Sequence, residues 1–184
     1  MEPDVFMSDF ERTEYGDAAF GAIGRLLAIA TRFEGNCKAL AVLLGCRDTT
    51  QASPLRSRQV IESLAEKILK LDLYKVVRRI AGKQKPVLET LDAARLARNE
   101  VAHDLAKGLD RSPDSLPQEY QLSHLARCRE LAYEIAEADT IVSLVASVLT
   151  GEPIPYGDVH SAYAERVADW VWDSTDMKEW HPTT

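Results

Sequence analysis

The chain has 184 residues, of which 46% are hydrophobic and 28% charged, and its formal net charge is -7. This length fits one ordinary domain, and the composition is that of a globule that can build a core rather than of a disordered chain. The acidic balance argues against a sequence-blind nucleic-acid coat protein, which would carry a basic excess. It leaves room for an enzyme that handles RNA through one local basic surface.

The cysteines and the apolar runs indicate a protein of a reducing compartment. Cys37, Cys46 and Cys128 are odd in number and far apart, so they indicate neither a disulfide framework nor a zinc knuckle, and we expect small buried thiols. The first residues are acidic, unlike a signal peptide, and the longest apolar stretches are too short to span a bilayer. We expect a cytoplasmic protein without a membrane span, metal or cofactor.

Two helical patterns occupy the first 82 residues. Ser8 and Glu11 have the form of a capping box, and apolar residues then recur at three- and four-residue steps to about Cys46. Three glycines weaken this first segment and could divide or bend it: Gly21, Gly24 and Gly35. A polar loop is expected over 48–54. The second pattern has two extents, ending either near Leu71 or, through further apolar residues, at Gly82; its apolar positions are Val60, Leu64, Ile68, Leu71, Val76, Val77 and Ile80.

Three more helices are expected downstream. Pro86 suits the first turn of a helix over about 86–109, because its missing N–H costs nothing there. A turn-rich loop over 110–117 precedes a long helix over about 124–149, and a last helix begins near Asp158. The sequence therefore predicts an all-α, up-and-down bundle of four to five helices, with one domain over 1–173 and a loosely ordered tail over 174–184.

The helix expected over 86–109 carries a charged residue on its apolar side. At about 100° per residue, one stripe contains Leu91, Ala94, Val101, Ala102, Leu105 and Leu109. Arg98 falls in the middle of this stripe, where its guanidinium must reach water or a partner. Asn99 and His103 are four residues apart and therefore point the same way, along one edge of the stripe.

Arg98, Asn99 and His103 suit phosphodiester chemistry. Arginine's planar fork matches two phosphate oxygens, and histidine can give or take a proton near neutral pH. Since no metal-ligand pattern occurs in the sequence, we expect cleavage of RNA by its own 2′-OH, a reaction that needs no metal. One chain offers one such histidine, so a two-fold dimer would supply both an acid and a base and would place Arg98 at an interface.

A structural interpretation of Arg98 stands beside the functional one. An arginine and a nearby histidine can occur by chance, and Arg98 could be a buried structural residue paired with Asp72, Glu89 or Asp92. A third interpretation gives Arg98 a bound nucleotide phosphate that is never cleaved.

The segment from Lys70 to Arg98 is locally basic, with eight basic residues against three acidic ones. A basic surface beside the motif would steer RNA, although a solvated helix surface explains any single residue equally well. The residues expected to bind RNA are Arg95, Lys83, Lys85, Arg78 and Arg79.

The segment Arg98-Asn99-(x)3-His103, within the run LDAARLARNEVAHDLAKGL, resembles the signature of HEPN proteins (higher eukaryotes and prokaryotes nucleotide-binding). The resemblance implies an up-and-down helical bundle that dimerises through the motif helix, with a composite site at the interface. It also implies a metal-independent endoribonuclease, a toxin or phage-defence effector, with Arg98, Asn99 and His103 catalytic and Glu100 supporting.

One position departs from a pattern within that family. Members paired with a nucleotidyltransferase antitoxin often have a tyrosine three residues after the motif histidine, and here that residue is Ala106. The resemblance therefore favours neutralisation by a bound antitoxin or defence-complex protein over nucleotide transfer. The alternative function is a non-catalytic binding or regulatory module that keeps the HEPN scaffold.

Overall fold

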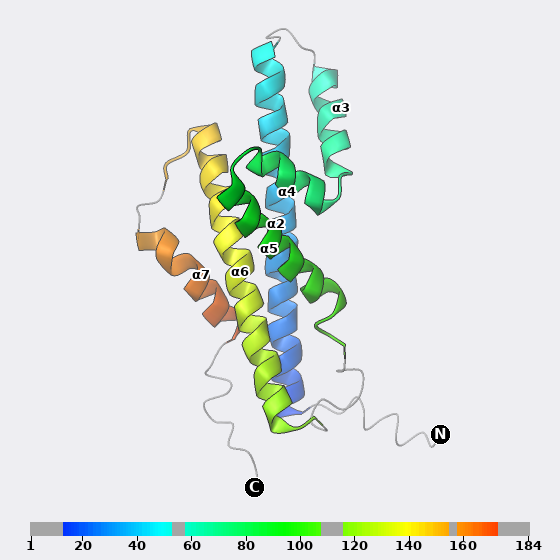
Figure 1. Cartoon of the computed structure of the whole chain (residues 1–184), viewed down its shortest axis with the longest axis vertical. Coiled ribbons are helices and arrows are strands. Elements are labelled where there is room, and N and C mark those ends of the chain that lie inside the picture. Colours follow the sequence, from blue (N-terminus) through cyan, green and yellow to red (C-terminus); the bar gives the residue numbers. More distant parts are fainter. Residues whose placement is uncertain (1–12, 53–57, 108–115, 155–157, 173–184) are drawn as a thin grey trace, which may run out of the picture.

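A computed structural model describes residues 13–52, 58–107, 116–154 and 158–172. This part of the chain is all-helical, as predicted, and contains six helices rather than four or five (Figure 1). They are α2 (Glu14–Ala52), α3 (Arg58–Leu69), α4 (Leu73–Ala81), α5 (Lys85–His103), α6 (Gln118–Thr150) and α7 (Asp158–Val171). The proposed capping box at Ser8 and the tail over 174–184 lie outside the described residues.

Helix α2 is one uninterrupted helix of 39 residues. The sequence placed its end near Cys46 and a loop from 48, and that boundary was wrong by about one and a half turns. The glycines do not divide it because the buried residues keep their three- and four-residue spacing across them, and packing of that stripe outweighs local propensity. The stripe consists of Ala19, Ala22, Leu26, Ala30, Phe33, Cys37, Leu40 and Ala41.

The second helical pattern breaks at residues 70–72. The Asp72 side chain accepts a hydrogen bond from the Lys75 N–H at 2.9 Å and thereby caps α4. Gly82, with φ of 55°, ends α4 in a conformation that favours glycine. The break lets α4 turn independently of α3 and bury four residues of its own: Leu73, Val76, Val77 and Ala81.

Pro86 lies in the first turn of α5, as predicted, but α5 ends at His103 rather than near 109. Helix α6 begins six residues before the predicted start and ends at Thr150, where it is capped by Gly151, whose φ of 73° is left-handed. The predicted start of α7 at Asp158 is confirmed.

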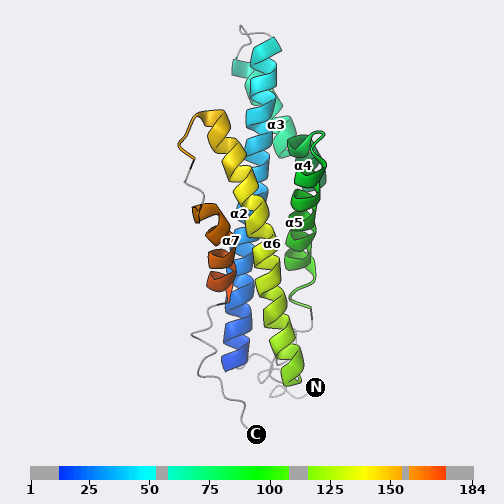
Figure 2. The same ribbon diagram turned by 60° about the vertical axis from the view of Figure 1, so that its left-hand side comes forward.

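The helices form four segments of alternating direction, which are α2, the group of α3, α4 and α5, then α6, and finally α7. Helices α2 and α6 run parallel and side by side, because α3, α4 and α5 together make the return between them (Figure 1). Helix α7 then runs back along α6, on the side away from α5 (Figure 2). Within the described helices, none is long and apolar enough to cross a bilayer.

A buried carboxylate connects α2, α6 and α7. Asp139 of α6 is 2% exposed and accepts hydrogen bonds from Asn36 Nδ2 of α2 at 2.8 Å and from the Tyr163 hydroxyl of α7 at 3.3 Å. Arg32 Nε lies 3.3 Å from its second oxygen. Asp139 therefore fixes the relative positions of α2, α6 and α7.

Cys37 and Cys128 are buried and free, as predicted, and Cys46 is half-buried. Burial raises the pKa of the Cys37 and Cys128 thiols to about 12. Both thiols therefore stay protonated and unreactive at neutral pH.

Candidate functional site

Arg98 projects from α5 toward α2. Its Nη2 lies 2.6 Å from Glu34 Oε2, and the two side chains are 29% and 23% exposed. The expectation of an arginine on the core-facing side that reaches a partner therefore holds, but the partner is none of the three carboxylates that the sequence offered. The apolar stripe around it also differs, since Ala97 is buried and Ala102 is exposed, while Leu109 lies outside the described residues.

Glu34 is shared by two cations. Lys38 Nζ lies 2.8 Å from Glu34 Oε1, one helical turn along α2. The hydrogen bond from Lys38, together with the charge of Arg98, outweighs burial and lowers the pKa of Glu34. One carboxylate thus faces an ammonium and a guanidinium, which leaves this contact with a net positive charge.

Asn99 and His103 lie on the outer side of α5. Asn99 Oδ1 accepts a hydrogen bond from Arg98 Nη1 at 3.3 Å, so the structure brings these two motif residues together. His103 is exposed and is the last residue of α5. It lies five positions after Arg98, which places the two side chains about 140° apart around the helix axis. A single chain therefore does not direct Arg98 and His103 at one point.

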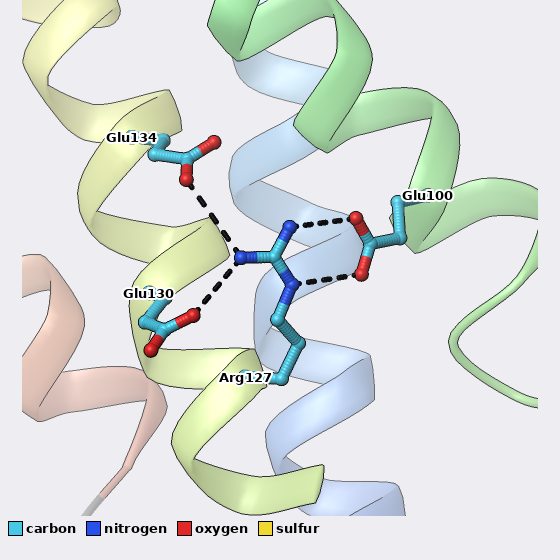
Figure 3. A network of polar contacts seen from close by, with 4 residues as sticks. All are labelled: Glu100, Arg127, Glu130 and Glu134. Carbon is cyan, nitrogen blue, oxygen red and sulfur yellow. Dashed lines mark hydrogen bonds and ion pairs between the residues drawn. The ribbon is translucent and has the colours of Figure 1, made fainter. Parts of the chain in front are cut away.

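Glu100, the predicted supporting residue, forms a two-pronged ion pair with Arg127 of α6 (Figure 3). Arg127 Nε donates to Oε1 at 2.9 Å and Nη2 donates to Oε2 at 2.7 Å. The remaining nitrogen, Nη1, lies 2.9 Å from Glu130 and 3.8 Å from Glu134. The hydrogen bonds from Arg127 lower the pKa of Glu100, so this carboxylate is charged and occupied at neutral pH.

A second contact with α6 lies just beyond His103. His124 Nε2 is 3.0 Å from the Leu105 carbonyl oxygen, and since a carbonyl only accepts, Nε2 carries the proton. Glu100 and Leu105 therefore hold the backbone on both sides of His103 against α6. The sequence missed Arg127 and His124 as partners because each is separated from its contact by many residues and has no motif of its own.

Four of the five predicted RNA-binding residues are exposed: Arg78, Arg79, Lys83 and Lys85. Lys85 Nζ lies 3.5 Å from Glu89. The fifth, Arg95, is 17% exposed and donates from Nε to Asp92 at 2.6 Å. The guanidinium groups of Arg78 and Arg95 both lie over the ring of Tyr74. Tyr74 was not among the predicted site residues, and its only signal in the sequence was an aromatic residue inside a basic segment.

The described residues contain no group of three or more His, Cys, Asp or Glu side chains placed to hold a metal ion. In comparisons with known proteins, no family model, curated protein or solved structure matches the chain. The likeness to HEPN proteins therefore depends on the segment from Arg98 to His103.

Proposed function

We propose that the protein is a metal-independent endoribonuclease of the cytoplasm that acts as a homodimer and cleaves RNA by attack of the RNA's own 2′-OH. The observation that carries the proposal is the arrangement of Arg98, Asn99 and His103 at the end of α5. The guanidinium is held between Glu34 and Asn99, and the imidazole is exposed on an anchored helix end. A toxin or a phage-defence effector is the class of protein that the resemblance implies.

In this mechanism Arg98 binds the scissile phosphate. The contacts with Glu34 and Asn99 use one hydrogen on each terminal nitrogen, so the guanidinium keeps further N–H donors for phosphate oxygens. Lys38 shares the charge of Glu34 and thereby weakens its competition with phosphate. A guanidinium fixed in advance loses little freedom when substrate binds, which favours stabilisation of developing negative charge.

His103 exchanges the protons. As a base it takes the proton of the 2′-OH, and as an acid it gives a proton to the leaving 5′-oxygen. Because Arg98 and His103 diverge by about 140° on one helix, a second copy of α5 facing the first would complete the site with a second imidazole. The products would be a 2′,3′-cyclic phosphate and a free 5′-OH.

The test is incubation of the purified protein with single-stranded RNA in excess chelator. We expect cutting by the wild type and by the matched control Arg166→Ala, whose side chain is exposed on α7. We expect a loss of at least about 100-fold in Arg98→Ala and His103→Ala. RNA methylated at its 2′-oxygens should survive, and equal cutting by all four proteins would refute the proposal.

A second candidate is a non-catalytic binding module within a toxin–antitoxin or defence complex. The 2.6 Å ion pair between Arg98 and Glu34 favours it, because such a pair is also what a structural arginine makes. This candidate expects no nuclease activity in any variant. It also expects Arg98→Ala and Glu34→Gln both to lower the unfolding midpoint, since each breaks the ion pair between these two side chains.

A further inference from the structure

Tyr74 forms an exposed aromatic platform at the start of α4. Its side chain is 45% exposed, and the guanidinium carbons of Arg78 and Arg95 each lie 5.5 Å from its ring centre. Arg78 Nη1 also donates to the Tyr74 hydroxyl at 3.0 Å. Both guanidiniums lie over the ring within the limit of a cation–π contact, about 6 Å, and Tyr74 nevertheless keeps 45% of its surface exposed.

The charges around Tyr74 are positive overall. Its two nearby aspartates are already engaged, Asp72 with Lys75 at 2.8 Å and Asp92 with Arg95 at 2.6 Å. Within the part of the chain that the structure describes, three exposed cations on α4 and the following turn have no ion-pair partner: Arg78, Arg79 and Lys83. A polyanion can therefore approach this surface although the whole chain carries -7.

We propose that Tyr74, Arg78 and Arg95 bind one nucleotide of single-stranded RNA, with the base stacked on the Tyr74 ring and its phosphate held by the guanidiniums. The proposal rests on the proposed ribonuclease function and names a subsite for its substrate. An exposed aromatic ring among cations is the combination that single-stranded nucleic acids recognise, because every unpaired base offers a flat face beside a charged phosphate. The bases of a duplex are already stacked on one another, so the platform selects single strands.

The platform lies next to the motif along α5. Arg95 is one turn before Asn99 and two turns before His103, which is about 12 Å along the helix axis. A stacked strand advances about 3.4 Å per nucleotide, so the base on Tyr74 lies about three to four nucleotides along the strand from the one at His103. The platform would therefore set which strands bind and in which register, whereas Arg98 and His103 act on the bond.

The test measures binding without cleavage. A fluorescent single-stranded RNA methylated at all 2′-oxygens is titrated with the full chain, and its anisotropy is followed. We expect Tyr74→Ala to weaken binding by between about 5-fold and 150-fold, the range for loss of one stacked base. Tyr74→Phe keeps the ring and should bind within about twofold of the wild type. Tyr133→Ala, which removes a tyrosine that is 37% exposed on α6, is the matched control and should bind like the wild type.

Two further arms complete the experiment. Arg78→Gln should weaken binding without removing an aromatic ring, and a duplex of the same sequence should bind more weakly than the single strand. Equal affinity of the wild type and Tyr74→Ala, or a preference for the duplex, would overturn the inference. So would Tyr74→Phe binding as weakly as Tyr74→Ala. Failure of the ribonuclease proposal would appear separately, as binding that depends on Tyr74 without cutting of unmethylated RNA.

Discussion

At the scale of single residues, the contact between Glu100 and Arg127 makes stability depend on pH. Arg127 lowers the pKa of Glu100 below its ordinary value of 4.5, so the unfolded chain binds this proton more readily than the folded one. The contribution of the pair is therefore complete well above pH 4.5. It is lost as the pH falls below that value and through the lowered pKa.

Glu100→Gln should accordingly lower the free energy of unfolding at pH 7 by about 0.5–1 kcal/mol, the upper range for a partly exposed pair. The difference from the wild type should shrink as the pH falls below 4.5. Urea unfolding followed by circular dichroism between pH 3 and pH 7 measures it. Glu137→Gln, at an exposed position of α6, is the control. A stability difference that grows as the pH falls would contradict the assignment.

Residue patterns in the sequence located the motif but not its contacts. Periodicity placed Arg98 on the core-facing side of its helix, and the structure agrees. Its partner, Glu34, lies on α2, and no local rule connects residues so far apart in sequence. The same limit hid Arg127 from Glu100. Long-range pairing depends on how helices pack, which composition and spacing do not specify.

At the scale of elements, the glycines of α2 differ in their role: some only lower the helix propensity, and one allows neighbouring helices to pack closely. A Cβ added at Gly24 or Gly35 would meet no heavy atom within 4 Å. A Cβ at Gly45 would lie 3.1 Å from Arg79 Nη2, 3.1 Å from Leu64 Cδ2 and 3.2 Å from Ile68 Cδ1. Gly45 therefore permits a close approach of α3 and α4 to α2, whereas the other two only weaken the helix.

Gly24→Ala should raise the free energy of unfolding by about 0.5–1 kcal/mol, because alanine loses less conformational freedom in a helix. Gly45→Ala gains the same amount locally but crowds three side chains, so we expect a net loss of about 1 kcal/mol. Urea unfolding of the two variants side by side measures the contrast. Equal stabilisation by both would show that the contact at Gly45 is loose.

Helix boundaries could be predicted from the sequence where a single residue begins or ends the helix. Gly82, Pro86 and the start of α7 at Asp158 agree with the sequence. The sequence did not decide whether the second helical pattern breaks before α4, because the apolar spacing continues across residues 70–72. The hydrogen bond by which Asp72 caps α4 sets the break. The end of α2 was misplaced because polar residues after Cys46 continue a helix that packing on α3 supports.

At the scale of the whole molecule, charge is unevenly distributed. The basic surface of α4 and the following turn lies within a chain of net charge -7. Salt screens the attraction between this surface and RNA, so we expect the affinity for RNA to fall as the salt concentration rises. Three unpaired cations that each neutralise one phosphate would give a slope of about -2 in a plot of log affinity against log salt.

Lys83→Gln should reduce the steepness of that plot by about 0.7, the share of one phosphate contact. Anisotropy titrations of the methylated single strand between about 50 and 200 mM salt measure it. Lys67→Gln, at an exposed position of α3, should leave the slope unchanged. A slope near zero would mean that the basic surface does not bind phosphate.

The parallel pairing of α2 with α6 sets the order in which a growing chain can fold on the ribosome. Helix α2 is complete roughly 65 residues before α6 begins. At a synthesis rate of about 5–20 residues per second, several seconds therefore pass between the completion of its apolar stripe and the synthesis of its main partner. Asp139 gains its hydrogen bond from Tyr163 later still, because Tyr163 is synthesised only with α7, the last described helix. During synthesis this protein therefore exposes a long amphipathic helix to chaperones and to other nascent chains before it can bury it.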